Sequence, residues 1–397
     1  MEQILKILHD FLYSPEQQHL AYSIIDAIVY LFFLVAVLYL LLFSLKALSK
    51  RHNEYTAAKK KYRFGIIFTA RGSDDLIKKS VDKFLEQKYP RDKYDIIVVG
   101  VGLTPETERV LQSTSAVVLT SDNLRQTKTD SIKKAMNYIE EERLGFDIIV
   151  ILDADNEVDD NYLEKLNDAF YSGCSIVQTH CRAKRCTTSI SVLDAVSEEI
   201  NNSIFRKGHT RFGLSSGLNG SGMALEYNIL KKFFTQRDVE NLDKQLERFL
   251  LKREYYIEYL NDIYTYNEKV AQREQYYKQR RQWLSAQFYN LLHGIWGCPK
   301  AAIEGNWDYC NKLLQWAMPP RVVLFGLIIL IAIGLTIMGS TWAIKWWVLL
   351  VAVILVFVFS VPDYLFNGKL LKALFGLPLI FGMMVINSII GLFKHHN

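Results

Sequence analysis

Long apolar runs at both ends of the chain constrain its fold more than any other feature. Residues 25–43 are apolar throughout except for Asp26, and a helix of about 20 such residues crosses a hydrocarbon core of roughly 30 Å. This run predicts a transmembrane helix over residues 25–45. Three later runs predict transmembrane helices over residues 322–339, 344–361 and 373–393. No basic region precedes the first run and no small-residue cleavage site follows it, which argues against a signal peptide.

Basic residues next to the first run indicate its orientation. Those that follow it are Lys46, Lys50, Arg51, Lys59, Lys60, Lys61 and Arg63. Because lysine and arginine are enriched on the cytoplasmic side of membrane helices, we expect an integral protein of the inner or plasma membrane with its central part in the cytoplasm. The alternative, that the runs are buried helices of a soluble protein, is disfavoured by their length.

Two segments next to the apolar runs have an amphipathic character. These are residues 1–24 and residues 291–320, in which Trp296, Trp307 and Trp316 alternate with polar residues. Such segments can lie in the membrane interface as short helices. They can equally be ordinary helices packed on the central domain.

The central residues 62–290 are charged and numerous enough to bury a core of their own. A net charge of +5 is small for 397 residues, and without a basic stripe of interleaved aromatics we expect no nucleic-acid partner. The five cysteines show no paired spacing typical of zinc. Their odd number suits reduced thiols in a cytoplasmic domain.

Short apolar strands alternate with helical segments in this central part. Strands are predicted over residues 64–70, 95–102, 116–120 and 147–155, with a helix over residues 131–142. This alternation is typical of an α/β domain with a mostly parallel sheet and helices on both faces. Ligands of such sheets bind beyond the carboxyl ends of the strands, so functional residues are expected where the apolar runs end.

Two aspartates close the most apolar of these strands. Asp153 and Asp155 are separated by one residue, so their side chains leave the strand on the same side. Paired carboxylates supply the hard oxygen ligands that Mg²⁺ or Mn²⁺ shares with substrate phosphates. The alternative is a solvated strand end, but the position after a buried strand favours a metal site.

This pattern resembles the catalytic core of the family 2 glycosyltransferases with the GT-A fold, especially their membrane-integrated branch of cellulose, chitin and hyaluronan synthases. The similarity runs from about residue 64 to residue 283. It implies a Rossmann-like GT-A domain in the cytoplasm, transmembrane helices at both ends, and a hexosyltransferase that uses a nucleotide sugar.

The resemblance also assigns residues to the donor. The family's first strand ends in a loop that contacts the nucleotide, and its lysine loop contacts the diphosphate; here the spacing after that loop is one helical turn longer than usual. The matching donor-binding residues are Thr69, Ala70, Arg71, Lys128, Asp130 and Asp153. Asp153 and Asp155 match the metal ligands.

Two later segments resemble the family's acceptor motifs. Residues 218–225 are similar to its Gly-Ser-Gly-Met-Ala segment, and residues 279–283 to its Gln-x-x-Arg-Trp motif, with Gln282 in place of the arginine. The implied acceptor contacts are Gly220, Ser221, Gly222 and Trp283, and the implied diphosphate contacts are Gln279, Arg280 and Arg281. The alternatives are a turn between strands and an interfacial Trp-Arg cluster at a helix end.

The family's catalytic base falls on an unusual residue. Its Thr-Glu-Asp motif aligns with residues 239–241, which places Asn241 at the position of the basic aspartate. An amide cannot act as a general base, so either Glu240 or Asp243 takes this role by a small shift, or the chain has changed its chemistry, or it is an inactive relative. The second strand also lacks the aspartate with which many family members recognise uracil. The identity of the nucleobase is therefore open, and UDP is the default nucleotide.

These features predict inverting, metal-dependent transfer from a nucleotide sugar, by default a UDP-sugar, to a growing polysaccharide at the cytoplasmic membrane face. The alternatives are glycosylation of a lipid acceptor and a non-catalytic sugar- or nucleotide-binding subunit of an envelope polysaccharide complex. The expected partners are the donor, a saccharide or lipid acceptor and membrane lipids. Four spans are few for a wide channel, so export of a polymer would need a homo-oligomer or an export partner.

Overall fold

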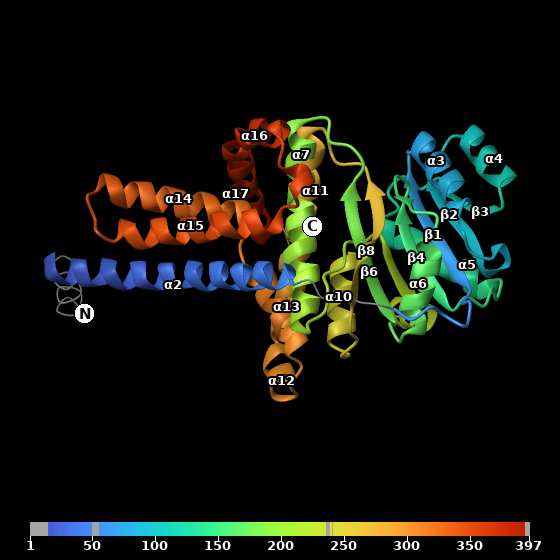
Figure 1. Cartoon of the computed structure of the whole chain (residues 1–397), viewed down its shortest axis with the longest axis horizontal. Coiled ribbons are helices and arrows are strands. Elements are labelled where there is room, and N and C mark those ends of the chain that lie inside the picture. The colour runs from blue at the N-terminus through green and yellow to red at the C-terminus, as the bar shows by residue number, and fades with distance from the viewer. Residues whose placement is uncertain (1–14, 50–54, 236–238, 240, 394–397) are drawn as a thin grey trace, which may run out of the picture.

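The structure is a computed structural model that describes residues 15–49, 55–235, 239 and 241–393. Figure 1 shows a sheet domain on one side and a group of long apolar helices that extends to the other side. Between them stand α7 (Ser189–Asn201) and α11 (Arg273–Ile295). The catalytic candidates lie in the sheet domain and along the side that faces these helices.

The sheet has eight strands in the described part of the chain, in the spatial order β3-β2-β1-β4-β7-β6-β8-β5. Their bounds are β1 Phe64–Arg71, β2 Tyr94–Val101, β3 Ala116–Ser121, β4 Ile148–Asp153, β5 Glu157–Val158, β6 Ile176–Ala183, β7 Met223–Glu226 and β8 Glu258–Asn267. The four predicted strands all form, with ends that differ by one or two residues. The predicted α/β fold class is confirmed.

One half of the sheet is parallel and the other half is mixed. Strand β1 pairs in parallel with β2 and β4, and β2 pairs in parallel with β3. Strand β7 lies antiparallel between β4 and β6, while β6 and β8 are parallel. Because β7 runs against β4, the chain just before β7 arrives at the carboxyl end of β4, where the aspartate pair lies.

Helices cover both faces of the sheet, as the continuous apolar strands require. One face packs on α3 (Asp74–Phe84), α4 (Pro105–Ser113) and α6 (Tyr162–Tyr171). The other packs on α5 (Lys128–Glu141), α9 (Tyr227–Phe234) and α10 (Leu242–Leu251). The alternation of Ile66 and Ile67 between the two cores follows from the period of two along β1.

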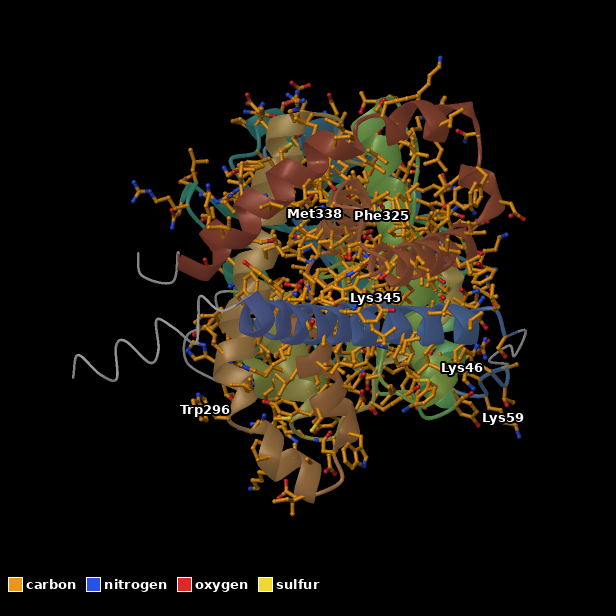
Figure 2. The ribbon with its side chains drawn as sticks, turned by 90° about the vertical axis from the view of Figure 1, so that its left-hand side faces the viewer. Lys46, Lys59, Trp296, Phe325, Met338 and Lys345 are labelled. Carbon is orange, nitrogen blue, oxygen red and sulfur yellow. The ribbon has the colours of Figure 1, made fainter. Side chains whose placement is uncertain are left out.

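The apolar helices α2 (Pro15–Ala47), α14 (Arg321–Ile337) and α15 (Ala343–Ser360) pack on one another. Val37, Ile328 and Trp346 are buried at their centre. Lys345, labelled in Figure 2, forms an ion pair with Asp26, so the one charged side chain of the first apolar run is neutralised within this group.

The remaining helices include η1 (Arg91–Lys93), which lies within the sheet domain just before β2, and α17 (Leu377–Phe393), which is itself apolar. The others are η2 Asn202–Gly208, α8 His209–Phe212, α12 Cys298–Ile303, α13 Trp307–Ala317, η3 Asp363–Leu365 and α16 Gly368–Leu374. The segment η2 is a π-helix. Within α13, Trp316 is buried in the core under the sheet, whereas Trp307 and the nearby Trp296 are exposed.

Two helices in the described part are long and apolar enough to cross a membrane, Tyr22–Ala47 and Ala343–Ser360. Two bent pairs qualify if each counts as one span: Trp307–Ala317 with Arg321–Ile337, bent by 55°, and Gly368–Leu374 with Leu377–Ile390, bent by 53°. The count is therefore two, or up to four. Outward-facing side chains such as Ile28 and Val351 are more than half exposed at 64% and 56%, as expected of helices that need an apolar surrounding.

Candidate active site

A cavity of about 420 Å³ lies at the carboxyl ends of β1 and β4, a size that suits a small organic ligand. It is lined by Thr69, Ala70, Arg71, Ser73, Leu76, Val101, Gln126, Thr127, Lys128, Ser131, Asp153, Ala154 and Asp155. Five of the six predicted donor-binding residues line it, together with both predicted metal ligands. We call it the donor cavity.

Asp153 is held by two neighbours at the floor of the donor cavity. The hydroxyl of Thr69 donates a hydrogen bond to its Oδ1 at 3.1 Å. The ammonium of Lys128 donates to the same oxygen and forms an ion pair with it. Lys128 is the first residue of α5, so its charge adds to the positive end of the helix, where anions such as phosphate bind.

Asp130, the sixth predicted donor-binding residue, caps this helix. Its Oδ2 accepts hydrogen bonds from the backbone N–H and the hydroxyl of Thr127, at 2.8 and 2.7 Å. The guanidinium of Arg71 donates to the carbonyl of Gln126 at 2.6 Å. Both contacts fix the loop that presents Lys128, while direct contact of Asp130 with the donor stays a prediction.

Asp155 lies deeper and is more constrained. Its Oδ1 accepts from the amide of Asn156 at 3.0 Å, and its Oδ2 accepts from the backbone N–H of Glu268 at 2.9 Å. Lys184 donates to its backbone carbonyl at 2.5 Å. Burial, and then the charge of Asp153, raise the pKa of the Asp155 carboxyl, which is the electrostatic situation that a bound cation relieves.

The residues present fit a divalent cation that is shared with a substrate. The described residues contain no group of three or more His, Cys, Asp or Glu side chains that could hold a metal alone. Asp153 and Asp155 would supply two carboxylates, and phosphate oxygens and water would complete the octahedral set that Mg²⁺ prefers.

The turn before β7 contacts the segment of Asp153 and Asn156 directly. Ser221 donates from its hydroxyl to Oδ1 of Asn156 and accepts from the backbone N–H of Asp153 at 3.2 Å. Gly222 has φ of +62°, and a Cβ there would lie 2.8 Å from Oγ1 of Thr179, so glycine is required at this position. Two predicted acceptor residues thus lie beside the aspartate pair.

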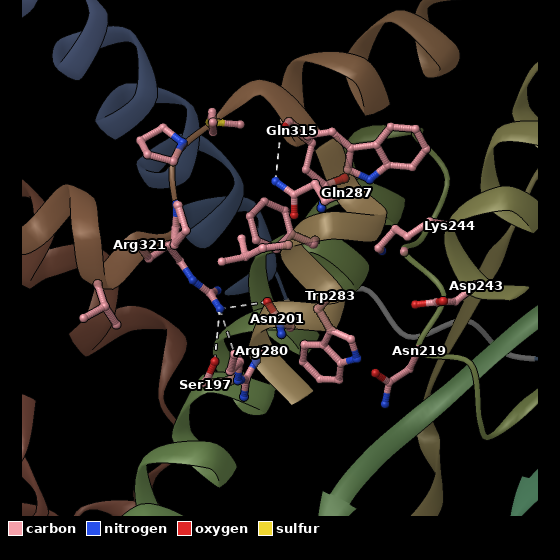
Figure 3. Close-up of a pocket in the computed structure, with 18 of the residues that line it drawn as sticks. Ser197, Asn201, Asn219, Asp243, Lys244, Arg280, Trp283, Gln287, Gln315 and Arg321 are labelled. Atoms are coloured by element: carbon pink, nitrogen blue, oxygen red, sulfur yellow. Dashed lines mark hydrogen bonds between the residues drawn. The ribbon is translucent and has the colours of Figure 1, made fainter. Parts of the chain in front are cut away.

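A second cavity of about 210 Å³ lies between the sheet domain and the apolar helices. Figure 3 shows Asp243 and Asn219 on one side of it and Arg321 on the other, with Trp283 between them. A Cβ on Gly220 would lie 3.7 Å from Cβ of Asp243. We call this space the acceptor cavity; the turn of residues 219–222 contacts the lining of both cavities.

The structure separates the three candidate bases. Asp243, in the first turn of α10, lines the acceptor cavity. Asn241 precedes the helix as its N-cap residue and does not line either cavity. Glu240 lies outside the described residues. Of the three candidate bases, Asp243 is therefore the one that the structure places in the lining of a cavity.

Of the three predicted diphosphate-binding residues, one lines a cavity and two do not. Arg280 is 7% exposed, lines the acceptor cavity, and pairs with Asp194. Its guanidinium lies 4.5 Å from the ring centre of Trp283. Gln279 and Arg281 line neither cavity, so the structure brings Arg280 and Trp283 to the site and leaves the other two aside.

A buried ion pair beside the acceptor cavity was not predicted. Arg206 and Glu198 are joined at 2.7 Å, and Arg206 also donates to the carbonyl of Gly217 at 3.2 Å. Burial opposes the charge on Glu198, but the Arg206 guanidinium brings its pKa down to about 2. Arg206 lies in the π-helix η2, and the 3.6-residue pattern used to predict helices gives no signal for such a turn.

A protein-family model matches the central domain of the chain. The family model described as "Glycosyltransferase like family 2" matches residues 62–286, more than half of the chain. No curated protein sequence matches the chain.

Solved structures show where the fold recurs. The chain is similar to the mannosyltransferase PcManGT from Pyrobaculum calidifontis in complex with GDP-Man and Mn²⁺, with a TM-score of 0.51 and 16% identity over 83% of this chain and 97% of that one. At this identity the likeness shows the fold alone. A structure of S. aureus TarS in complex with UDP also matches, with a TM-score of 0.37 and 14% identity over 57% of this chain and 65% of that one.

Proposed function

The chain belongs to glycosyltransferase family 2, and from this premise we propose that it transfers a sugar, with inversion and with a divalent metal, from a nucleotide sugar to an acceptor at a membrane surface. One observation carries the proposal. The donor cavity with Asp153 and Asp155 and the acceptor cavity with Asp243 are joined by the turn of residues 219–222.

The proposed position of the nucleotide sugar follows from the charged side chains of the donor cavity. The diphosphate of the nucleotide sugar would lie against Lys128 and the amino end of α5, and Asp153 and Asp155 would hold Mg²⁺ or Mn²⁺ next to it. Such a metal stabilises the negative charge that grows on the departing nucleoside diphosphate. A relative of similar fold is known in complex with GDP-Man and Mn²⁺, so both UDP- and GDP-sugars are candidate donors.

The acceptor side follows from the position of one carboxylate. Asp243 would take the proton of an acceptor hydroxyl as its oxygen attacks the anomeric carbon. Trp283 offers an aromatic face for the acceptor sugar ring in the same cavity. A single displacement of this kind inverts the configuration at the anomeric carbon.

The location of the acceptor cavity favours a lipid acceptor over a polysaccharide. Leu40 of α2, Leu324 of α14 and Met384 of α17 belong to its lining, so the cavity adjoins helices that are long and apolar enough to cross a membrane, alone or as part of a bent pair. We propose that these helices span the membrane in the manner of the integrated branch of the family, with the sheet domain on the cytoplasmic side, where Lys46 and its basic neighbours lie. Transfer to a polysaccharide remains the alternative.

A donor and acceptor screen tests this function. The purified full chain in detergent would be incubated with Mn²⁺, radiolabelled UDP- and GDP-sugars, and either membrane lipids or oligosaccharides. We expect one donor to release its nucleoside diphosphate and to pass its label into the organic phase, with an inverted anomeric centre by NMR. Nucleotide binding without turnover under every condition would indicate a non-catalytic subunit instead.

A further inference from the structure

Arg321 lies at the start of α14 and faces the acceptor cavity without a counter-ion. Its Nη2 donates to Oδ1 of Asn201 at 2.8 Å and to the carbonyl of Ser197 at 3.3 Å. Its Nη1 is buried and has no hydrogen-bond partner in the described part of the chain. No carboxylate of the described residues forms an ion pair with it, so the guanidinium is stabilised by neutral groups alone.

The other basic residues that line this cavity are all paired. The pairs are Arg206 with Glu198, Lys244 with Glu247, and Arg280 with Asp194. Arg280, although paired, also has a buried Nε without a partner among the described residues. A buried charge without a counter-ion is costly, and an anion in the cavity would remove that cost for Arg321.

The apolar helices also contribute side chains to the lining of this cavity. Leu40, Leu324 and Met384 belong to three helices that pass the length and hydropathy tests for membrane spans, alone or as part of a bent pair. Asp243 lies on the opposite side of the cavity from Arg321, with Trp283 between them. A ligand that satisfies the whole cavity therefore carries an apolar tail, an anionic group at Arg321 and a polar ring at Trp283 and Asp243.

We propose that the acceptor is a lipid phosphate that already carries a sugar. Its phosphate would pair with Arg321, which suits the donor geometry of a guanidinium, and its sugar would lie on Trp283 with one hydroxyl at Asp243. This proposal rests on the proposed function. The hydroxyl oxygen forms the new bond to the anomeric carbon, the bond to the nucleoside diphosphate breaks with its electron pair, and the proton passes to Asp243.

Two other acceptor classes fit less well. A neutral glycolipid would leave the Arg321 charge unpaired. A polysaccharide carries no apolar chain to place next to Leu40, Leu324 and Met384, which come from helices apolar enough to cross a membrane, alone or as part of a bent pair. Isoprenoid lipids and glycerophospholipids both carry such a phosphate, and both offer the chemistry that Arg321 selects.

Lipid binding without any donor tests the proposal. The purified full chain in detergent micelles would be given four radiolabelled probes: an isoprenyl diphosphate monosaccharide, phosphatidylglucoside, neutral glucosyl diacylglycerol, and glucose 1-phosphate. We expect at least tenfold tighter binding of one or both phosphate lipids than of the neutral lipid, and weak binding of the tail-less sugar phosphate. The stronger of the two phosphate lipids identifies the source.

Variants of Arg321 assign the preference to this residue. Arg321→Gln should reduce the preference for the phosphate lipid at least tenfold, Arg321→Lys should retain most of it, and Arg109→Gln, an exposed arginine on α4, should leave it unchanged. Equal binding of neutral and phosphate lipids by the unaltered chain overturns the proposal even if a variant does not fold. A preference that survives Arg321→Gln in folded protein also overturns it. Nucleotide-sugar binding with Mn²⁺, measured on the same protein, reports separately on the proposed function.

Discussion

Lys128 and Asp153 form an ion pair inside the donor cavity, although they come from the start of α5 and the end of β4. The pair places a positive charge next to a candidate metal ligand. When a diphosphate and its metal bind, this ion pair would separate. The ammonium of Lys128 would then contact the phosphate and the carboxylate of Asp153 would contact the metal.

The first prediction concerns this lysine. Lys128→Met should weaken nucleoside diphosphate binding about tenfold or more, which corresponds to about 1.4 kcal/mol, because a charge-assisted contact to phosphate is lost. Calorimetric titration with UDP and GDP measures it. Lys133→Met, an exposed lysine of the same helix, is the matched control, and equal affinities in the two variants would contradict the assignment.

The second prediction concerns the catalytic base. Asp243→Asn should lower kcat by about 10²–10⁴ and leave donor affinity nearly unchanged, because Asp243 lines the acceptor cavity and not the donor cavity. Asn241→Ala changes a helix N-cap without a side-chain hydrogen bond and should retain most of the activity. If Asn241→Ala removes turnover while Asp243→Asn does not, the base lies elsewhere.

Much of the donor side could be predicted from the sequence because it depends on local patterns. Strand β4 is an unbroken apolar run that ends at Asp153, and a period of two directs Asp153 and Asp155 to one side. The capping box of Thr127 and Asp130 starts α5 at Lys128, three residues before the predicted start at residue 131. The other differences in this part concern strand ends.

The acceptor side could be predicted less well because it depends on distant contacts. The antiparallel insertion of β7 brings Ser221 to Asn156, and nothing in the spacing of these residues indicates that pairing. The Arg321 environment requires α14 to meet α7 across 120 residues of sequence. The sequence offers both Glu240 and Asp243 as the general base, because a choice between them requires the position of α10.

The third prediction concerns the buried pair of Glu198 and Arg206. Glu198→Gln should lower the free energy of unfolding by about 3–5 kcal/mol at pH 7, because it leaves a buried guanidinium without its counter-ion. Glu140→Gln removes an exposed pair with Lys231 and should cost at most about 1 kcal/mol. Thermal denaturation in detergent compares the two.

The same pair predicts a pH dependence. Because the pKa of Glu198 is lowered to about 2 in the folded chain, against about 4.3 when unfolded, its stabilisation is fully present above the unfolded value and is lost as pH falls toward 2. The stability difference between the unaltered chain and Glu198→Gln should shrink across this window. A difference that is constant from pH 6 to pH 3 would contradict the ion pair.

The fourth prediction concerns the contact of α2 with the π-helix. A Cβ on Gly208 would lie 2.3 Å from the carbonyl oxygen of Phe43, so Gly208→Ala must push α2 away from η2. We expect a loss of about 1–3 kcal/mol in stability, as for other overpacked positions. Gly334→Ala, where a Cβ meets nothing within 4 Å, is the control, and an equal effect of both substitutions would rule out the close contact.

The central claim is metal-dependent sugar transfer at Asp153 and Asp155. The most direct test is a Mn²⁺ titration of nucleoside diphosphate release from the preferred donor, for the unaltered chain and for Asp155→Asn. Because both oxygens of Asp155 accept hydrogen bonds, from Asn156 and from the backbone N–H of Glu268, and asparagine keeps only one acceptor oxygen, thermal denaturation of both proteins serves as the control that the variant is folded. We predict saturable, Mn²⁺-dependent release that Asp155→Asn lowers at least a hundredfold; release that is independent of added metal, or equal in both proteins, would contradict the account.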